Sequence, residues 1–248
     1  PLQLLGSQND MATIRLQNRQ LRKQQEKVPD KEYGMIAVAA GEGLNNVFMD
    51  IDVDYVISGG QTMNPSANDI ATAADKVNAK NIFVFPNNKN IIMSAQQAND
   101  ITDKNLIVIP TKSIPEGVSA VLSFDATCSI DENKANMFDA IANVKSGSVT
   151  YAVRTTNVDG LDVKVGDIMG LDEHTVRTTG KDVCDTTIDL IGKILCPDSS
   201  NITLFYGEGV TEEDAGILQS KIEDKYPNVD VSMVYGGQPV YYYILSIE

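Results

Sequence analysis

The sequence predicts two α/β domains in series: a parallel α/β domain of three layers, followed by a smaller α+β domain with a mixed or antiparallel sheet. Short apolar strands alternate with segments of helical period up to about residue 146, a pattern typical of βαβ units. After that point the strands alternate in polarity. We therefore expect domains over residues 31–146 and 147–248, a hinge at Ser146-Gly147, and a linker or the tail of a preceding domain over residues 1–30.

Four apolar runs in the first part predict strands, and segments with the apolar period of a helix follow them. The strands are expected at Tyr33–Ala39, Tyr55–Ile57, Asn81–Phe85 and Leu106–Ile109. The helices are expected at residues 44–51, 66–77, 91–101, 115–124 and 131–144. Because the strands are apolar throughout, they predict a parallel sheet that is covered by helices on both faces.

The second part begins with alternating polarity over Val149–Val153, and Asp159-Gly160 is a hairpin signal. Further strands are expected at residues 163–165, 168–171, 176–179, 202–206, 229–235 and 241–247. Helices are expected at residues 183–195 and from Thr211, which has an acid at capping-box spacing. The short consecutive strands predict an antiparallel meander that continues into an α+β domain.

Composition excludes several classes of function. The chain has 248 residues and a formal net charge of −14, which disfavours nucleic acid and anionic membranes as partners. No apolar run approaches the roughly 20 residues of a transmembrane helix. Cys128, Cys184 and Cys196 lack a paired metal-binding spacing. An odd number of cysteines without a secretory signal suggests reduced thiols, so we expect a cytoplasmic protein.

Polar loops follow three of the predicted strands, and these loops are the candidate functional site. They cover Gly59–Ser66, Pro86–Asn90 and Tyr235–Pro239. In an open α/β sheet, ligands are bound at the carboxyl ends of strands. We therefore expect the first two loops to lie side by side and the third to approach from the second domain, closing a cleft. The candidate residues for binding a ligand or partner are Gly60, Gln61, Thr62, Asn64, Ser66, Asn87, Asn88, Lys89, Gly237 and Gln238.

Other motifs do not predict catalysis or metal binding. Gly41-Glu42-Gly43 lacks the third glycine of a dinucleotide fingerprint and the Lys-Ser/Thr of a phosphate loop. Asp50, Asp52 and Asp54 resemble the start of a calcium loop, but no glycine occupies loop position six. His174 is the only histidine and is expected in a solvated turn. The sequence therefore predicts no catalytic residue and no metal site in this chain.

Several motifs resemble the C-terminal region of the DegV-related fatty acid kinase A subunit, which is related to the dihydroxyacetone kinases. They are residues 55–66 (YVISGGQTMNPS), 84–92 (VFPNNKNII), 108–115 (VIPTKSIP), 147–154 (GSVTYAVR) and 236–243 (GGQPVYYY). The resemblance runs from about Tyr33 to Glu248 and implies a DegV-like fold. In that family an N-terminal kinase domain binds ATP and magnesium, and a middle domain follows it. The resemblance therefore implies no cofactor in this chain, and it makes residues 1–30 the tail of the middle domain.

The chain departs from DegV-type acyl binders at two loops. Those proteins bind a fatty-acid carboxylate with a Ser/Gly-rich second loop and with a histidine in a His-Thr-Gly-Pro-Gly stretch near the C-terminus. Here the second loop is Pro86–Asn90, and the C-terminal loop, Tyr235–Pro239, contains no histidine. An acyl carboxylate would therefore need other donors, such as Lys89.

The resemblance favours a non-catalytic scaffold and docking module of a bacterial fatty acid kinase. Such a module receives an acyl-carrying DegV-like protein and presents its carboxyl group to the kinase domain of the same polypeptide. Its expected partners are that protein and the kinase and middle domains, and homodimerisation stays open. The alternative is a fatty-acid or small-molecule binder, with the ligand between the domains on Thr62, Asn64, Asn88, Lys89 and Gln238. A third hypothesis is an enzyme whose active site these loops complete. An apolar cleft favours the binder, and a flat surface favours docking.

Overall fold

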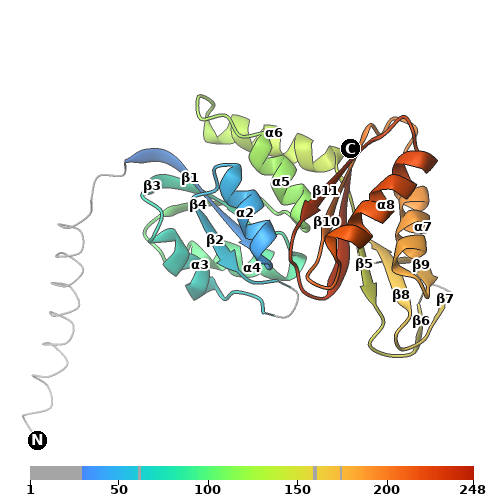
Figure 1. Ribbon diagram of the computed structural model, residues 1–248. Helices are drawn as coiled ribbons and strands as arrows, with labels where there is room; N and C mark the ends of the chain where they lie inside the picture. The colour runs from blue at the N-terminus through green and yellow to red at the C-terminus, as the bar shows by residue number, and fades with distance from the viewer. Residues whose placement is uncertain (1–29, 61–62, 159–160, 174) are drawn as a thin grey trace, which may run out of the picture.

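The computed structural model describes residues 30–248 except 61–62, 159–160 and 174. In the first domain, four parallel strands form a sheet with the order β2-β1-β3-β4 (Figure 1). The strands are β1 (Lys31–Ala39), β2 (Tyr55–Ser58), β3 (Ala79–Phe85) and β4 (Asn105–Val108). The helices are α2 (Glu42–Asp50), α3 (Ala67–Ala74), α4 (Lys89–Ala98), α5 (Ile114–Leu122) and α6 (Ile130–Asn143). These elements confirm the predicted parallel domain.

The helices form a layer on each face of the first sheet. Alternate residues of β1 enter different cores, because successive side chains of a strand point to opposite faces. Ile36 packs with residues of α3 and α4, whereas Ala37 packs with residues of α2, α5 and α6. Local capping fixes where two helices begin, since Ser66 and Ser129 each form a complete capping box with an acid three residues on.

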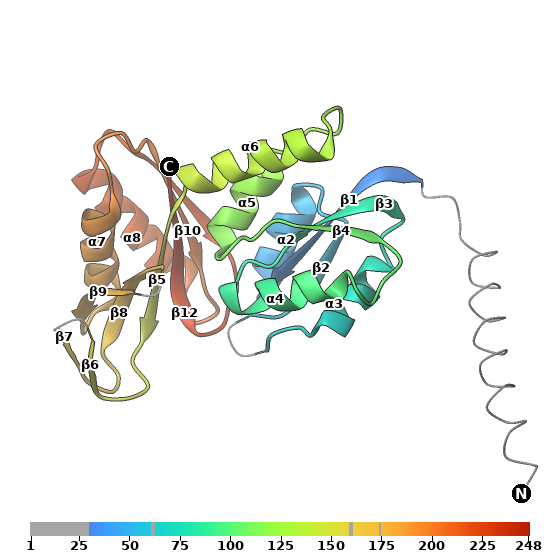
Figure 2. The same cartoon turned by 180° about the vertical axis from the view of Figure 1, so that it is seen from behind.

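The second domain is a six-stranded mixed sheet with the order β11-β10-β12-β5-β8-β9. Its strands are β5 (Lys145–Tyr151), β8 (Ile168–Asp172), β9 (Thr175–Gly180), β10 (Asn201–Tyr206), β11 (Asp230–Tyr235) and β12 (Tyr241–Ile247). The pair β10–β11 is parallel and the other pairs are antiparallel. The helices α7 (Val183–Ile194) and α8 (Glu212–Lys225) cover one face, and the first domain lies against the other (Figure 2).

The meander is confirmed in part. The strands β5, β8 and β9 pair antiparallel, as expected. Between them in sequence, β6 (Thr156–Val158) and β7 (Leu161–Val163) form a separate two-stranded sheet. The predicted hairpin turn Asp159-Gly160 lies outside the described residues.

The expected hinge at Ser146-Gly147 is wrong. Both residues lie inside β5, where Ser146 pairs with Ser246 and Gly147 pairs with Leu245 of β12. The physical reason for glycine here is packing, because a Cβ on Gly147 would lie 3.0 Å from the Ile194 side chain of α7. The domain division at residue 146 itself stays a prediction.

The two domains share a tightly packed joint. Phe205, Val234 and Ile244 of the second sheet belong to the same core cluster as α2 and α5. The Leu44 N–H near the start of α2 donates to the Gly236 carbonyl oxygen at 2.9 Å. A Cβ on Gly43 would lie 2.0 Å from the carbonyl oxygen of Tyr235, so only glycine allows this approach. The Gly41-Glu42-Gly43 motif is therefore a contact between the two backbones.

Among the described residues, every helix is too short or too polar to cross a membrane.

Candidate functional site

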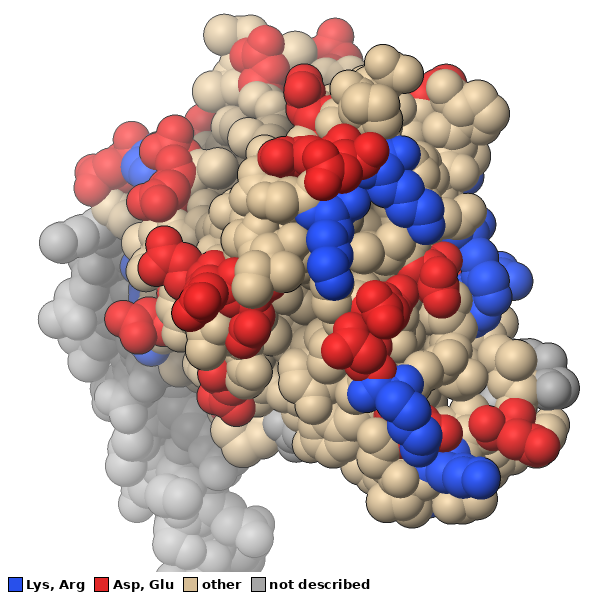
Figure 3. Space-filling model, turned by 45° about the vertical axis from the view of Figure 1, so that its right-hand side comes forward, with Lys and Arg blue, Asp and Glu red and all other residues tan. Residues whose placement is uncertain are grey.

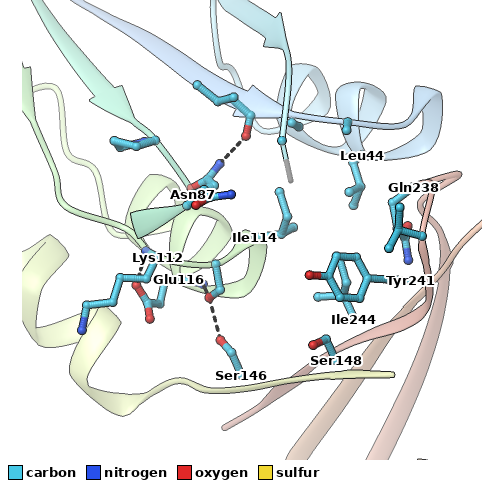
Figure 4. A pocket seen from close by; sticks show the side chains of 18 of the residues that line it. Leu44, Asn87, Lys112, Ile114, Glu116, Ser146, Ser148, Gln238, Tyr241 and Ile244 are labelled. Atoms are coloured by element: carbon cyan, nitrogen blue, oxygen red, sulfur yellow. Dashed lines mark hydrogen bonds between the residues drawn. The ribbon is translucent and has the colours of Figure 1, made fainter. Parts of the chain in front are cut away.

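A cleft lies where the carboxyl edge of the first sheet meets the second sheet (Figure 4). Its volume is about 160 Å³. The first domain contributes residues Val38–Ala40, Leu44, Gly59, Gly60, Pro86–Asn88, Lys112–Ile114 and Glu116. The second sheet and its loops contribute residues Ser146–Ser148, Leu171, Glu173, Gln238–Tyr241 and Ile244.

The predicted meeting of the three loops is confirmed as geometry. Gly60 follows β2, Asn87 follows β3, and Gln238 precedes β12, and all three line the same cleft. β1 lies between β2 and β3 in the sheet, so the two loops flank the end of β1 at the same edge. The expected cleft between the domains is therefore present.

Asn87 connects the loop after β3 to the neighbouring strands through hydrogen bonds. Its Nδ2 donates to the carbonyl oxygen of Val38 at 2.9 Å, and its Oδ1 accepts from Thr111 Oγ1 at 2.8 Å. Its backbone has a φ of 55°, a left-handed conformation that asparagine tolerates better than most residues. A Cβ on Gly117 would lie 2.1 Å from Asn87 Oδ1, so α5 needs glycine beside it. The buried Asn87 side chain thus joins the ends of β1 and β4.

The other predicted amides in the cleft also have structural partners. Asn88 is buried and caps α4, with its Oδ1 accepting from Asn90 N–H at 2.9 Å. Gln238 is 3% exposed, and its Nε2 donates to the carbonyl oxygen of Phe205 at 2.7 Å. Its Oε1 has no hydrogen-bond partner within the described part of the chain.

The remaining predicted site residues lie away from the cleft or at its margin. Asn64 is exposed and lines a separate groove between β2 and α3, with a volume of about 490 Å³. Ser66 caps α3, and Lys89 is exposed in the first turn of α4 and is not a cleft residue. Gly237 has a φ of 62° and lies beside the Tyr235 ring. Gln61 and Thr62, like the predicted turn residue His174, lie outside the described residues.

Sequence reasoning missed the charged groups of the cleft, which are Lys112, Glu116 and Glu173. Glu116 is 7% exposed, and its Oε2 accepts from the Lys112 N–H at 2.6 Å. Burial raises the pKa of the Glu116 carboxyl, and the Lys112 N–H and ammonium offset part of this rise. The signal was present, because Ser113 and Glu116 have capping-box spacing directly after a strand.

Tyr241 was also missed. Its side chain points from the β12 side of the cleft toward α5 (Figure 4). Burial raises the pKa of its phenol above the ordinary value of 10.0. The neutral hydroxyl can donate or accept a hydrogen bond.

Unusual backbone conformations are concentrated at the cleft. Four described residues other than glycine have a positive φ, and three of them line the cleft: Asn87, Glu173 and Val240. Such conformations cost free energy and tend to occur at binding and active sites. This concentration makes the cleft the best candidate site in the described part of the chain.

The molecular surface does not favour a polyanionic partner. On the face shown in Figure 3, Lys and Arg side chains lie among Asp and Glu side chains. The formal net charge of −14 adds to this argument. One cluster of potential metal ligands, Asp182, Cys184 and Asp185, is found among the described residues. Its groups have other partners, since Asp182 caps Asp185 N–H and Lys221 Nζ donates to Cys184 Sγ at 3.4 Å.

The fold and the inter-domain cleft define a DegV-like α/β protein. Among solved structures, the DegV family protein Cg2579 from Corynebacterium glutamicum aligns with a TM-score of 0.64 at 11% identity, over 88% of this chain and 97% of that chain. The Streptococcus pneumoniae fatty acid kinase B3 protein, loaded with linoleic acid, aligns with a TM-score of 0.59 at 15% identity, over 87% and 99%. A dihydroxyacetone kinase from C. freundii aligns with a TM-score of 0.57 at 12% identity, over 87% and 48%.

Sequence comparison specifies the family. The model of the FakA-like C-terminal family, named for the A subunit of fatty acid kinase, matches residues 34–248, and the chain therefore belongs to that family. An uncharacterized protein of Staphylococcus aureus is 40% identical over 240 residues. The alignment covers 95% of this chain and 44% of that relative, so the chain spans less than half of its length. The resemblance inferred from the loop motifs is thus confirmed.

Proposed function

We propose that this chain is a docking module of a fatty acid kinase and receives an acyl-carrying DegV-like protein at the inter-domain cleft. In this proposal the partner carries the fatty acid, and a kinase domain outside the chain binds ATP and magnesium. The observation that carries the proposal is the convergence of three loops on one cleft in a chain of the FakA-like C-terminal family. The concentration of positive-φ residues at this cleft supports the same location.

The contents of the cleft favour docking over storage of a fatty acid. A volume of about 160 Å³ is below the roughly 300–1,000 Å³ of ordinary small-molecule sites. Among the described residues that line the cleft, Glu116 and Glu173 carry carboxyl groups, and Lys112 is the one cationic side chain. The amide group of Asn87 is bonded to Val38 and Thr111, and the Oδ1 of Asn88 is used in capping α4. Lys89, the expected carboxylate donor, is not a cleft residue.

The second candidate function is fatty-acid binding by the chain itself. Two observations favour it. The domains enclose a mainly apolar cleft and not a flat surface, which is the outcome expected for a binder. The starts of α4 and α5 also line the cleft at Asn88 and Ser113, and Lys112 precedes Ser113. Backbone N–H groups at helix N-termini favour negative charge. Several DegV-family neighbours are described as fatty-acid binding proteins, which supports this alternative as well. In both cases the protein belongs to a fatty-acid-related system.

A pair of binding measurements separates the two functions. The chain is titrated with linoleic acid alone and with a DegV-family protein of the same organism loaded with linoleic acid. Docking predicts that the loaded protein binds and the free fatty acid does not. Ser148→Arg places a long side chain in the cleft and is expected to weaken docking at least about tenfold, mostly through faster dissociation.

The matched control for this variant is Ser220→Arg, because Ser220 is exposed on α8, which covers the opposite face of the sheet. It is expected to bind the loaded protein like the wild type. If the wild type binds free linoleic acid and Ser148→Arg abolishes that binding, the second function is correct and docking is not. Equal loss of docking in both arginine variants would place the interface elsewhere.

A further inference from the structure

The segment Pro239–Tyr241 forms a γ-turn with an unusual central residue. Val240 has a φ of 73°, and the Tyr241 N–H donates to the Pro239 carbonyl oxygen at 2.8 Å. A γ-turn with positive φ is rare and strained, and positive φ in a β-branched residue is an outlier. Glycine adopts this conformation without such strain. The chain therefore has valine at a position where the backbone alone favours glycine.

The surrounding residues stabilise the strained turn from both sides. Thr150 Oγ1 of β5 donates to the Val240 carbonyl oxygen at 2.8 Å. On the other side, Gly207 N–H donates to the Tyr242 carbonyl oxygen at 2.9 Å. A Cβ on Gly207 would lie only 2.1 Å from the Tyr241 carbonyl oxygen, so the backbones are in close contact. This packing fixes the turn in one conformation despite the cost of the positive φ.

Local structure explains the other positive-φ residues of the cleft but does not explain the valine. The backbone of Asn87 is compensated by the two hydrogen bonds of its buried side chain. Glu173 lies in the short turn between β8 and β9, where a hairpin requires such a conformation. The Val240 side chain makes no hydrogen bond and is 39% exposed at the cleft. Its apolar side chain thus has no evident structural role in the free molecule.

We propose that Val240 is a recognition residue of the docking cleft: the packed Pro239–Tyr241 turn holds the valine side chain exposed at the cleft rim, where the docking partner buries it. This inference rests on the proposed function and names a determinant of partner recognition at the same site. A turn that is rigid before binding has less conformational entropy to lose when the partner docks. The exposed valine adds apolar area that the partner can bury.

Substitution of Val240 by glycine tests this role, because stability and binding should change in opposite directions. Val240→Gly removes the strain and is expected to raise the melting temperature by about 2–4 °C. It also removes the apolar contact and gives the turn more backbone freedom to lose on docking, so affinity for the DegV-family protein loaded with linoleic acid should fall at least about tenfold. Val240→Ile keeps the branched apolar side chain and should keep the affinity within about twofold.

Val153→Gly is the matched control, because Val153 is 78% exposed in the second domain and is absent from the cleft and from the positive-φ residues. It should not raise the melting temperature and should leave affinity unchanged. Unchanged affinity of Val240→Gly, while the wild type binds, would overturn the inference without touching the proposed function. If Val240→Gly melts at a lower temperature than the wild type, the Pro239–Tyr241 turn is not strained by the valine. Failure of the wild type to bind would remove the proposed function and this role with it.

Discussion

At the scale of single residues, polar side chains in the loops divide into two groups. Asn87 and Asn88 are buried, Asn87 joins the ends of β1 and β4, and Asn88 caps α4, so both help to determine the shape of the cleft. Lys112 and Glu116 also line the cleft and bring charge to it. Some of the amide residues predicted at strand ends therefore line the candidate cleft, but their positions in the sequence do not say which side chains are free to meet a partner.

Glu116 predicts a characteristic dependence of stability on pH. Because burial raises its pKa in the folded protein, the protonated form stabilises the fold. That contribution is complete below the ordinary pKa of 4.5 and is lost as pH rises through the raised value. Glu116→Gln has no carboxyl group to ionise, so it does not lose this stability as pH rises. Its melting temperature should therefore increase relative to the wild type between about pH 4 and pH 7.

Glu132 provides a control of opposite sign. The Ser129 hydroxyl and N–H donate to its carboxylate and lower its pKa. The wild type thus gains stability above the ordinary pKa and loses it as pH falls. The melting temperature of Glu132→Gln should decrease relative to the wild type over the same rise in pH. A Glu116→Gln difference that is flat with pH, or that follows Glu132→Gln, would contradict the burial of the Glu116 carboxyl.

At the scale of elements, the joint between the domains depends on glycines more than on a linker. The start of α2 contacts the Tyr235–Gly237 segment through the backbone. The Gly41-Glu42-Gly43 sequence lacks the residues of a phosphate loop. In the structure its glycines allow the backbone of α2 to approach the backbone of the second sheet. A close contact between two backbones leaves no signature in a single sequence other than the glycines themselves.

Gly43→Ala is expected to weaken this joint. Its Cβ would lie 2.0 Å from the Tyr235 carbonyl oxygen, which is a backbone atom and cannot move away as a flexible side chain would. We expect a loss of about 2 kcal/mol, which corresponds to a fall in melting temperature of about 4–8 °C. Gly216→Ala in α8 is the control, because a Cβ there would meet nothing within 4 Å. It should stabilise the helix by about 0.5–1 kcal/mol. Equal melting temperatures for the two variants would contradict the close contact.

The sequence predicted most elements, because apolar strands and helical periods are local signals. The parallel strands, the five following helices and the late strands lie where the periodicity places them. The hinge was misplaced, because Ser146-Gly147 has the composition of a linker and its strand pairing is with residues about 100 positions away. The charged residues of the cleft were missed for a similar reason, since burial of Glu116 depends on a neighbouring sheet that no local pattern reports.

At the scale of the whole molecule, two sheets of different kind form one cleft at their joint. The parallel sheet contributes strand ends, as expected for an open α/β sheet. The mixed sheet contributes β5, β8 and the strained turn before β12. The face of this sheet that lies against the first domain therefore completes the cleft. This arrangement places the candidate docking residues of both domains around a single opening.

Amide hydrogen exchange of the chain, free and in complex with the DegV-family protein loaded with linoleic acid, tests the central claim most directly. The docking account predicts that the amides of residues 87–88, 112–114, 116, 238 and 240–241, which surround the cleft, exchange at least about tenfold more slowly in the complex. Amides of α8, on the opposite face, should be unaffected. Protection confined to α8 or to the groove between β2 and α3, in a complex that has formed, would contradict the account.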